Sequence, residues 1–563
     1  MKKEESGIQN KARSTRNPIV FLILNTFCLI LFPSCANIVA PTGGDKDSQP
    51  PVFLSAEPDT NSVNFSDNKI RLNFDEYVDL NNIQNQLIIS PDLQPKPKVT
   101  VSGKSVLVDL KKDTLRPNTT YAFQFGSGIK DYTEGNILKD FRYVFSTGNT
   151  IDTNKFIGKT YDSQTGSPLA EAWVLLYING SDSSLLNERP YYLAQSGPDG
   201  SFKMLNLAPG KYRAFALMDK NTNFKWDLGE KAGFLEHEIE IPSTEDKKIY
   251  LFDQPAPKTE LIDVMNPLAG KYVFVFNNPI KTFYCEGSIK GDSVITELSK
   301  TKDTLFYFTG AASTAKQVFY YEINGGKRDS FSVQYPKSVR DSADNKASAA
   351  NFVYRNQYTA TGKSFSVNQT KVNPADPFVL HFTRPIQKID LSRMAVLQDS
   401  QKLAPNFNVV FLNKSKTSVR LGESTSPGEN YNMVFPKGSF TDYNGIENSE
   451  FELSFTTEKK ENLCSVSVVF LSDTTRGLLV LKDKTGNAIY SAKIDEAFLA
   501  DKSGQKIKNL LSGEFSFYLV KDENKNGKWD TGNVFQNKQA EKVIKLREKV
   551  FIKPGWEYTL EVK

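Results

Sequence analysis

Apolar and polar residues alternate along many short segments of this chain. Clear examples are residues 70–74, 106–110, 379–382, 452–455 and 515–520. Alternation with a period of two is typical of a β-strand that buries one face. No segment keeps a 3.6-residue apolar spacing beyond two or three turns, and the best helical candidate, residues 491–499, is short. The pattern therefore predicts an all-β fold.

The composition agrees with a β protein of several domains. The chain has 563 residues, with 39 Phe, 23 Tyr, 34 Gly and 27 Pro. Aromatic residues favour strands, whereas Gly and Pro favour the turns between them. A single domain usually has about 100–200 residues, so we expect four or five domains. At 39% hydrophobic and 24% charged residues, the chain is too apolar to be disordered.

Charge and histidine content exclude several classes of function. The formal net charge is only +5, so a broadly basic surface for nucleic acid is not expected. The two histidines, His237 and His381, lie far apart in the sequence. Two histidines so far apart exclude most metallohydrolases and most Ser-His or Cys-His nucleophile systems.

The N-terminus predicts a secretory signal. Several Lys and Arg residues precede an apolar run at residues 18–32, which is shorter than the ~20 residues that span a bilayer. Residues 31–35, Leu-Phe-Pro-Ser-Cys, resemble a loose bacterial lipobox, which implies that Cys35 is lipidated. Plain secretion is the alternative. We therefore expect a signal peptide at residues 1–34, and the lipidated Cys35 with a tether at residues 35–50.

One internal repeat links two segments about 310 residues apart. Phe74 and Phe382 stand at corresponding positions, 308 residues apart, and so do Phe145 and Phe455, 310 residues apart. The residues that match in the turn between them are Asp131, Gly135 and Asn136 in one copy and Asp442, Gly445 and Asn448 in the other. The two segments, residues 51–148 and 352–457, resemble the SbsA-type bacterial Ig-like domain, which implies a β-sandwich.

A second repeat has a constant offset of 303 residues between the segments that begin at Gly210 and Gly513. The upstream part of the first copy resembles the transthyretin-like, carboxypeptidase-regulatory-like β-sandwich. The residues that carry this resemblance are Asp199, Gly200, Phe202, Leu207, Pro209, Gly210 and Tyr212. It implies two such modules, at residues 154–253 and 462–563.

The whole chain is then a tandem array of Ig-like and transthyretin-like β-sandwich domains. Residues 257–350 repeat the opening strand of the Ig-like segments weakly and are interpreted as a divergent β-sandwich. The array resembles a family of Bacteroidetes outer-membrane lipoproteins with an N-terminal SbsA-type Ig-like domain. That family implies no enzymatic activity.

Each transthyretin-like segment contains a loop rich in Asp and Asn, with possible oxygen ligands at positions 1, 3, 5, 9 and 12. These residues are Asp219, Asn221, Asn223, Asp227 and Glu230 in the first loop and Asp522, Asn524, Asn526, Asp530 and Asn533 in the second. This spacing is that of a calcium loop, and the few carboxylates predict weak Ca²⁺ binding. The alternative is a hairpin turn stabilised by Asx hydrogen bonds, with Trp226 and Trp529 packed over it.

Other candidate residues carry weaker signals. His381 lies in an alternating strand and is interpreted as structural, whereas His237 lies among glutamates and is expected to be solvated. The adjacent carboxylates of Asp75 and Glu76 are compatible with a catalytic pair, but no cleft follows from the sequence.

These features predict a non-enzymatic, lipid-anchored protein of the outer membrane that acts as a binding or scaffold subunit beside other envelope proteins. One alternative is a glycan-binding surface lipoprotein, which predicts exposed aromatic residues clustered on one face. The other is a hydrolase, which predicts a pocket with convergent carboxylates of raised pKa. The residues after Cys35 lack an early acidic run, which weakly favours the periplasmic side of the membrane.

Overall fold

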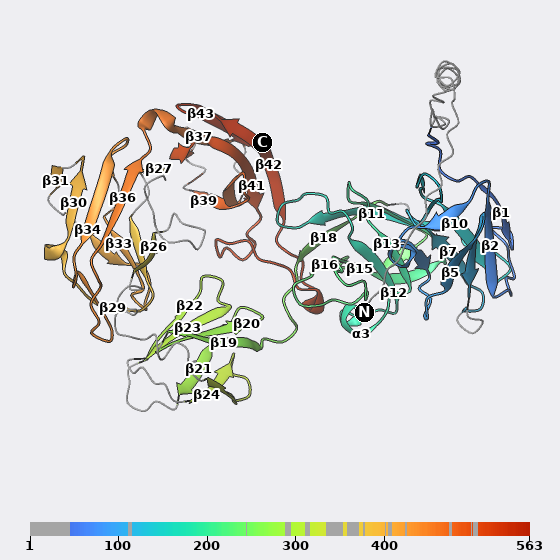
Figure 1. The fold of residues 1–563 in the computed structure, drawn as a ribbon, viewed down its shortest axis with the longest axis horizontal. Coiled ribbons are helices and arrows are strands. Elements are labelled where there is room, and N and C mark those ends of the chain that lie inside the picture. Colours follow the sequence, from blue (N-terminus) through green and yellow to red (C-terminus); the bar gives the residue numbers. More distant parts are fainter. Residues whose placement is uncertain are drawn as a thin grey trace, which may run out of the picture.

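The computed structural model describes the chain from residue 46 onward, with gaps. The described residues are 46–110, 115–243, 245–268, 270–287, 294–309, 316–333, 353–356, 371–374, 378–399, 401–403, 408–422, 425–471, 476–496, 498 and 505–562. The predicted signal peptide and Cys35 lie outside them. The fold is nearly all β, as the alternation predicts, and its sheets divide among five β-sandwich modules (Figure 1).

The first Ig-like module packs a four-stranded sheet, β1-β2-β6-β5, against the sheet β10-β7-β4. A third sheet, β3-β8-β9, completes it. Its elements are β1 (Phe53–Glu57), β2 (Lys69–Phe74), β3 (Val78–Leu80), α2 (Ile83–Gln86), β4 (Ile88–Ser90), β5 (Lys98–Ser102), β6 (Ser105–Asp109), β7 (Thr120–Gln124), β8 (Ile129–Asp131), β9 (Ile137–Leu138) and β10 (Arg142–Ser146).

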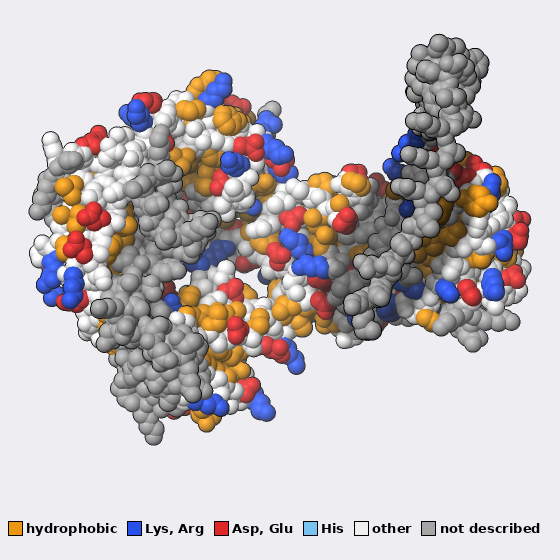
Figure 2. Space-filling model, viewed as in Figure 1, with side chains coloured by type: hydrophobic (Ala, Val, Ile, Leu, Met, Phe, Trp, Pro, Cys, Tyr) orange, Lys and Arg blue, Asp and Glu red, His pale blue; other side chains and the backbone are white. Residues whose placement is uncertain are grey.

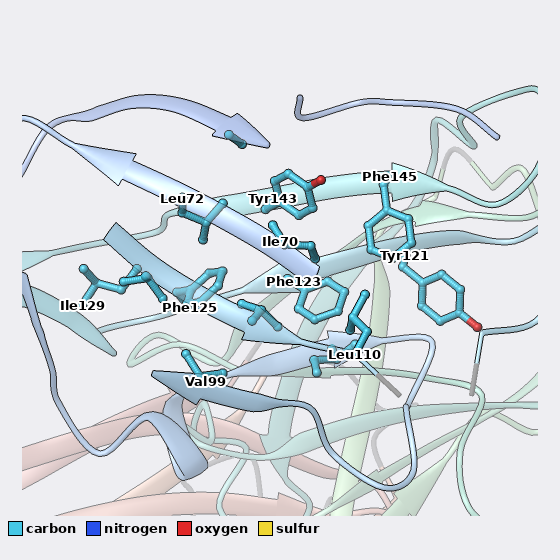
Figure 3. Packing of buried hydrophobic residues seen from close by; sticks show 14 of the residues in the cluster. Ile70, Leu72, Val99, Leu110, Tyr121, Phe123, Phe125, Ile129, Tyr143 and Phe145 are labelled. Atoms are coloured by element: carbon cyan, nitrogen blue, oxygen red, sulfur yellow. The ribbon is translucent and has the colours of Figure 1, made fainter. Parts of the chain in front are cut away.

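The core of this module combines aromatic with aliphatic side chains (Figure 3). Phe145 is fully buried and stacks on Tyr121, with ring centroids 5.5 Å apart. Ile70 and Leu72 of β2 enter the same core because they point to one face of the strand. The aromatic rings contribute more than buried area, since stacked and tilted ring pairs add attraction of their own.

The first transthyretin-like module has the strand order β13-β12-β15-β16-β18-β11-β14, and β17 pairs with β15. The pair β11–β18 is parallel. Its elements are β11 (Asn154–Asp162), β12 (Trp173–Ile178), α3 (Ser184–Asn187), β13 (Tyr192–Gln195), β14 (Ser201–Leu207), β15 (Gly210–Leu217), β16 (Lys231–Phe234), β17 (Ile239–Ile241) and β18 (Lys247–Asp253).

The middle module contains the sheets β19-β20-β23-β22 and β21-β24-β25. The first of these has the same order of neighbours as β1-β2-β6-β5, which agrees with a divergent relative of the Ig-like modules. Its strands are β19 (Leu261–Leu268), β20 (Lys271–Phe276), β21 (Phe283–Gly287), β22 (Val294–Leu298), β23 (Thr304–Thr309), β24 (Gln317–Ile323) and β25 (Asp329–Val333).

The second Ig-like module repeats the plan of the first, with sheets β26-β28-β33-β32, β27-β36-β34-β30-β31 and β29-β35. Its elements are β26 (Val353–Asn356), β27 (Lys371–Val372), β28 (Val379–Phe382), β29 (Ile386–Ile389), η2 (Leu391–Arg393), β30 (Ala395–Gln398), β31 (Gln401–Leu403), β32 (Val409–Phe411), β33 (Ser418–Leu421), β34 (Asn430–Phe435), β35 (Phe440–Asp442) and β36 (Phe451–Thr457).

The second transthyretin-like module has sheets β40-β37-β43 and β39-β38-β41-β42. Its elements are η3 (Lys460–Asn462), β37 (Leu463–Phe470), β38 (Gly477–Asp483), β39 (Ala488–Ile494), β40 (Gln505–Leu511), β41 (Gly513–Val520), η4 (Val534–Gln536), β42 (Val543–Ile552) and β43 (Glu557–Val562). The best helical candidate of the sequence, residues 491–499, thus begins inside a strand. Residues 491–494 pair with β38 as the end of β39, whereas Glu496 and Phe498 are helical, so the prediction holds only for the second half of the segment.

The pairing confirms that the two transthyretin-like modules share one topology. β11 pairs antiparallel with β14 and parallel with β18, and β37 pairs in the same way with β40 and β43. The pair Gly210–Ile241 of the first module corresponds to Gly513–Ile552 of the second. The offset is 303 residues before the loop and 311 after it, so the second module carries extra residues between these strands.

The central strands of the first transthyretin-like module are apolar on both faces. Along β15, Ala214 and Ala216 face the interior of the sandwich, whereas Phe215 and Leu217 face outward into a separate buried cluster. The alternation in the sequence therefore predicts only one of the two buried faces of β15, that of Tyr212, Ala214 and Ala216. A strand buried on both faces needs a second layer over it, and distant parts of the chain supply that layer here.

Candidate functional site

The first Asp/Asn loop lies between β15 and β16 and is closed by its own side chains. The carboxylate of Asp219 accepts backbone N–H bonds from three residues: Asn221 (3.1 Å), Thr222 (2.7 Å) and Phe224 (2.7 Å). Oδ2 of Asp227 accepts bonds from the side-chain amides of Asn221 and Asn223, at 2.7 and 2.8 Å. The loop therefore brings Asp219, Asn221, Asn223 and Asp227 together, as the sequence predicts.

Glu230 holds the base of this loop. Its Oε1 accepts the N–H of Lys220 at 2.8 Å and its Oε2 accepts the N–H of Asp227 at 3.0 Å. The indole N–H of Trp226 donates to the Glu230 carbonyl at 2.9 Å. Glu230 is only 3% exposed, so these two bonds compensate the carboxylate for the water it has lost.

Phe224 occupies the sixth loop position, where the second copy has Gly527. It has a φ of +59°, in the left-handed region that side chains normally avoid. Its ring is 4% exposed and meets Trp173 edge-on, with centroids 5.0 Å apart. Burial of this ring offsets the backbone strain. Gly527, with φ +75°, reaches the same conformation without strain.

The second loop repeats this network with one change of residue. Asp522 accepts the N–H of Gly527 at 2.8 Å, and Asn526 donates its amide to Asp530 at 2.9 Å. The carboxylate at the base of the loop, however, belongs to Glu541. Its Oε1 accepts the N–H of Glu523 and its Oε2 that of Asp530, both at 3.0 Å.

Glu541, rather than Asn533, therefore occupies position 12 of the second loop. The indole N–H of Trp529 donates to the Glu541 carbonyl at 2.9 Å, as that of Trp226 does to Glu230. Asn533 instead caps η4 by accepting the N–H of Phe535 at 3.0 Å. Counting along a constant offset misses Glu541, because ten residues separate it from Asp530 whereas two separate Glu230 from Asp227. The Glu-Lys pair at both sites is the sequence signal that could have found it.

The loops carry the oxygen-rich side chains that Ca²⁺ prefers. Most of these oxygens already accept hydrogen bonds within the loop: Oδ1 of Asn223 accepts the N–H of Lys225 at 2.6 Å, and both carboxylate oxygens of Glu230 are engaged. Within the described residues, no group of three or more His, Cys, Asp or Glu side chains is placed to hold a metal ion. The geometry thus fits the Asx hairpin alternative, and Ca²⁺ binding stays a prediction.

A cleft of about 700 Å³ lies beside the second loop, where the two transthyretin-like modules meet. One wall is formed by residues 234–240, which include His237. A second wall is formed by the start of β18, with Lys248 and Tyr250, and a third by residues 539–543 of the C-terminal module. Its lining mixes carboxylates, lysines and apolar side chains. His237 is exposed, as expected.

Glu541 lines this cleft and has a raised pKa. Burial raises the pKa of Glu541, and the nearby charges of Asp530 and Asp522 raise it further, while the two backbone N–H bonds act in the opposite direction. Because both of its oxygens already accept those bonds, the carboxyl is poorly placed to exchange a proton with a substrate. Glu541 is therefore not a free carboxylate in this cleft.

Two exposed tyrosines lie side by side on the first Ig-like module. Tyr77 is 61% exposed and Tyr132 is 73% exposed, and the N–H of Tyr132 donates to the Tyr77 carbonyl at 2.9 Å. Nζ of Lys104 lies 5.8 Å from the centroid of the Tyr77 ring. Burial raises the pKa of the neighbouring Glu76, and the charges of Asp131 and Asp75 raise it further.

The other candidate residues have structural roles. Nδ1 of His381 lies 2.8 Å from Oγ of Ser418, and burial, with the charge of Lys300, lowers the pKa of His381. Cys285 and Cys464 are free thiols, and burial raises the pKa of both. Among the described residues, no helix is long and apolar enough to cross a membrane. On the face in Figure 2, described side chains of both charges are interspersed.

Comparisons with known proteins support the fold and little beyond it. No curated protein matches the sequence. The structure is similar to the major pilin subunit BcpA of Bacillus cereus (D312A variant) at 11% identity and TM-score 0.14, covering 73% of this chain and 99% of that one. It is also similar to domains 1–6 of the surface layer protein SbsC, at 11% identity and TM-score 0.14, covering 90% of this chain and 68% of that one.

A third similar structure is the Bacillus anthracis TIE protein, at 10% identity and TM-score 0.14, covering 92% of this chain and 76% of that one. Likenesses this distant carry no argument about function. The family model of the bacterial Ig-like domain, in contrast, matches residues 47–147 directly. These residues comprise the first Ig-like sandwich described above, so the chain carries a bacterial Ig-like domain in its N-terminal module.

Proposed function

We propose that this chain is a non-enzymatic, lipid-anchored protein of the bacterial outer membrane that acts as a binding or scaffold subunit for other envelope proteins. Lipidation of Cys35 would supply the anchor, and residues 35–50 would form the tether to the first Ig-like module. The observation that carries the binding role is the cleft between the two transthyretin-like modules, because an unpaired strand edge lies in its wall.

That edge belongs to β18. β18 pairs with β11 along residues 247–251 and with β16 at Phe252 and Asp253, and β16 also approaches Tyr250 through Gly233; within the described residues no strand pairs with the other edge of residues 247–249. The N–H of Ser163 donates to the Leu251 carbonyl at 2.8 Å, on the β11 side. Since backbone groups alternate in direction along a strand, those of Lys248 point away from β11, whereas the Tyr250 carbonyl lies against Gly233 of β16.

An unpaired edge inside a cleft suits an extended peptide. Such a segment would add a strand to β18 through main-chain hydrogen bonds, and the cleft walls would select its side chains. Glu236, Glu238 and Glu240 on the opposite wall favour a partner segment that carries Lys or Arg. We therefore propose that the partner is an envelope protein that inserts an extended segment here.

Site-specific crosslinking tests this function. A photo-crosslinking amino acid at Tyr250, in cells that make the full chain, should form an adduct with one discrete partner. The same amino acid at Tyr284, an exposed tyrosine of the middle module, is the matched control. Equal adducts at both positions, or none at Tyr250, would contradict binding in the cleft.

Glycan binding is a second candidate, favoured by the exposed pair Tyr77 and Tyr132. Two tyrosine rings beside carboxylates are a suitable platform for stacking a sugar and for hydrogen-bonding its hydroxyls. Retardation of the full chain in gels that contain soluble polysaccharides should be lost in Tyr77→Ala, and not in Tyr284→Ala, if this candidate holds. Equal mobility of all three proteins in every gel would exclude it.

A further inference from the structure

The outer face of the first transthyretin-like module is an apolar surface that its own strands cannot cover. The side chains that form it come from β12, β15, β16 and β18 and from the first Asp/Asn loop. They include Trp173, Leu175, Phe215, Leu217, Trp226, Phe234 and Phe252, all of them buried. Their cover comes in part from residues 531–540, the docking insertion, which belongs to the second transthyretin-like module.

The docking insertion fits closely into this surface. Val534 belongs to the same cluster and is fully buried, and the ring of Phe535 meets Trp226 edge-on with centroids 5.5 Å apart. At Gly532 the backbone approaches the ring of Phe252 so closely that a Cβ would lie 2.5 Å from it. Such packing is as close as that of a protein interior.

Hydrogen bonds fix the insertion in one register. The N–H of Val534 donates to Oε1 of Gln254 at 2.7 Å, and Oγ1 of Thr531 donates to the Asp253 carbonyl at 2.8 Å. Nε2 of Gln539 donates to the Phe234 carbonyl at 2.9 Å. Gln254 is buried, and losing the insertion would remove Val534 as the donor to its side-chain oxygen and Asn533 as an acceptor for its side-chain amide.

The insertion is an addition to a hairpin that is complete without it. The first module closes the same loop with two residues, Leu228 and Gly229, between Asp227 and Glu230. In the second module, the bond between Glu541 and the N–H of Asp530 joins the two ends of the insertion. The extra residues are therefore not needed to fold their own module, and their contacts lie on the other one.

The remaining modules complete a closed path. The middle module is linked to the first transthyretin-like module by Asn278, whose amide bonds to the backbone of Ala256. Ser415 of the second Ig-like module bonds to Glu297 of the middle module, and Asn373 bonds to the backbone of the C-terminal module. In Figure 1 the C-terminal module, in red, returns to the first transthyretin-like module, in teal.

We propose that the docking insertion closes residues 154–562 into a ring of four modules. It does so by binding the apolar outer face of the first transthyretin-like module. Docking joins two parts of one chain, so its entropic cost grows only slowly with the length of the intervening chain. Closure also buries the linker at Gln254 and Ala256, which would otherwise be an exposed junction between modules. The first Ig-like module lies outside the ring.

Replacing residues 531–540 with Leu-Gly, the two residues of the first copy, tests closure in the full chain. The variant should have a larger radius of gyration by small-angle scattering. Limited proteolysis should cut it at residues 254–259, where the wild type resists. Cleavage at residues 459–461, which are exposed and lie far from the insertion in sequence, should be equal in both proteins and controls for protease activity. A variant as compact and as resistant as the wild type would overturn the proposal.

Two single substitutions test closure independently, in case the deletion variant misfolds. Gly532→Val adds side-chain atoms where Phe252 leaves no space, whereas Gly513→Ala, in the same module, adds a methyl group with no atom within 4 Å. The first should open the ring and the second should not. A stable dimer of Gly532→Val or of the wild type, with the linker protected, would show that the insertion seats on a second copy and would overturn closure within one chain.

Discussion

Nη2 of Arg213 donates to Oδ1 of Asn537 at 2.8 Å, across 324 positions of the chain. Arg213 lies in β15, is 6% exposed, and also donates to Asp182 at 2.8 Å and to the Leu235 carbonyl at 2.6 Å. A buried guanidinium needs an acceptor for its donors, and Asn537 supplies one from the docking insertion. The buried guanidinium of Arg213, in the first transthyretin-like module, thus depends on the last module for one of its hydrogen-bond acceptors.

Asn537 should therefore contribute to docking through its side chain. It has a φ of +50°, so Asn537→Gly keeps the left-handed backbone while removing the acceptor. Losing a hydrogen bond to a charged group costs about 1.5–3 kcal/mol, so the amide of Val534 should exchange with solvent about 10- to 100-fold faster. Asn537→Asp, which keeps an acceptor, should exchange as slowly as the wild type. Equal rates in all three proteins would contradict this role.

The pH dependence of the second loop should follow Glu541. Burial and the charges of Asp530 and Asp522 raise the pKa of Glu541, so the folded state binds its proton more tightly than the unfolded state. The stability that this group contributes is full below its unfolded pKa of about 4.3 and is lost as pH rises through the folded pKa. Exchange of the Asp530 amide should therefore accelerate over that range in the wild type. Glu541→Gln should show a flatter profile, and an unchanged profile would assign the titration to another group.

Calcium binding by the first loop should appear as local protection of Phe224, whose N–H donates to Asp219. At ten times the dissociation constant, Ca²⁺ should slow exchange of this amide about tenfold relative to EDTA. Asp219→Asn, which removes the charge and keeps an acceptor, should abolish the effect. The full chain is the correct sample, because the docking insertion covers the outer face of this module. Identical exchange with and without Ca²⁺ would leave the Asx hairpin.

Lipidation of Cys35 should be lost in Cys35→Ala. The thiol is the only acceptor for the diacylglycerol group in a lipobox, so the variant should remain uncleaved or become soluble. Palmitate labelling of cells that express the two proteins measures this directly. Labelling that persists in Cys35→Ala would show that the anchor lies elsewhere, and Cys28→Ala serves as the control within the leader.

Local patterns determined the all-β class, the two repeats and most of the Asp/Asn loops. Alternation such as that of residues 70–74 requires only the period of a strand, and Asp219 binds backbone N–H groups within five positions of itself. Such features depend on residues that are close in the sequence, so they can be predicted without the tertiary structure. The bacterial Ig-like match at residues 47–147 agrees with the N-terminal copy of the first repeat.

Only the tertiary structure decided the partners of the docking insertion and the identity of the carboxylate beneath the second loop. Val534 and Phe535 look like ordinary apolar residues of a polar loop, and nothing near them in sequence indicates Trp226 or Gln254 as contacts. The sequence by itself determined which strands have an apolar face; it did not determine that Phe215 and Leu217 face outward beneath residues from another module. Burial is a property of surfaces brought together across hundreds of residues, whereas periodicity reports only the face a strand presents.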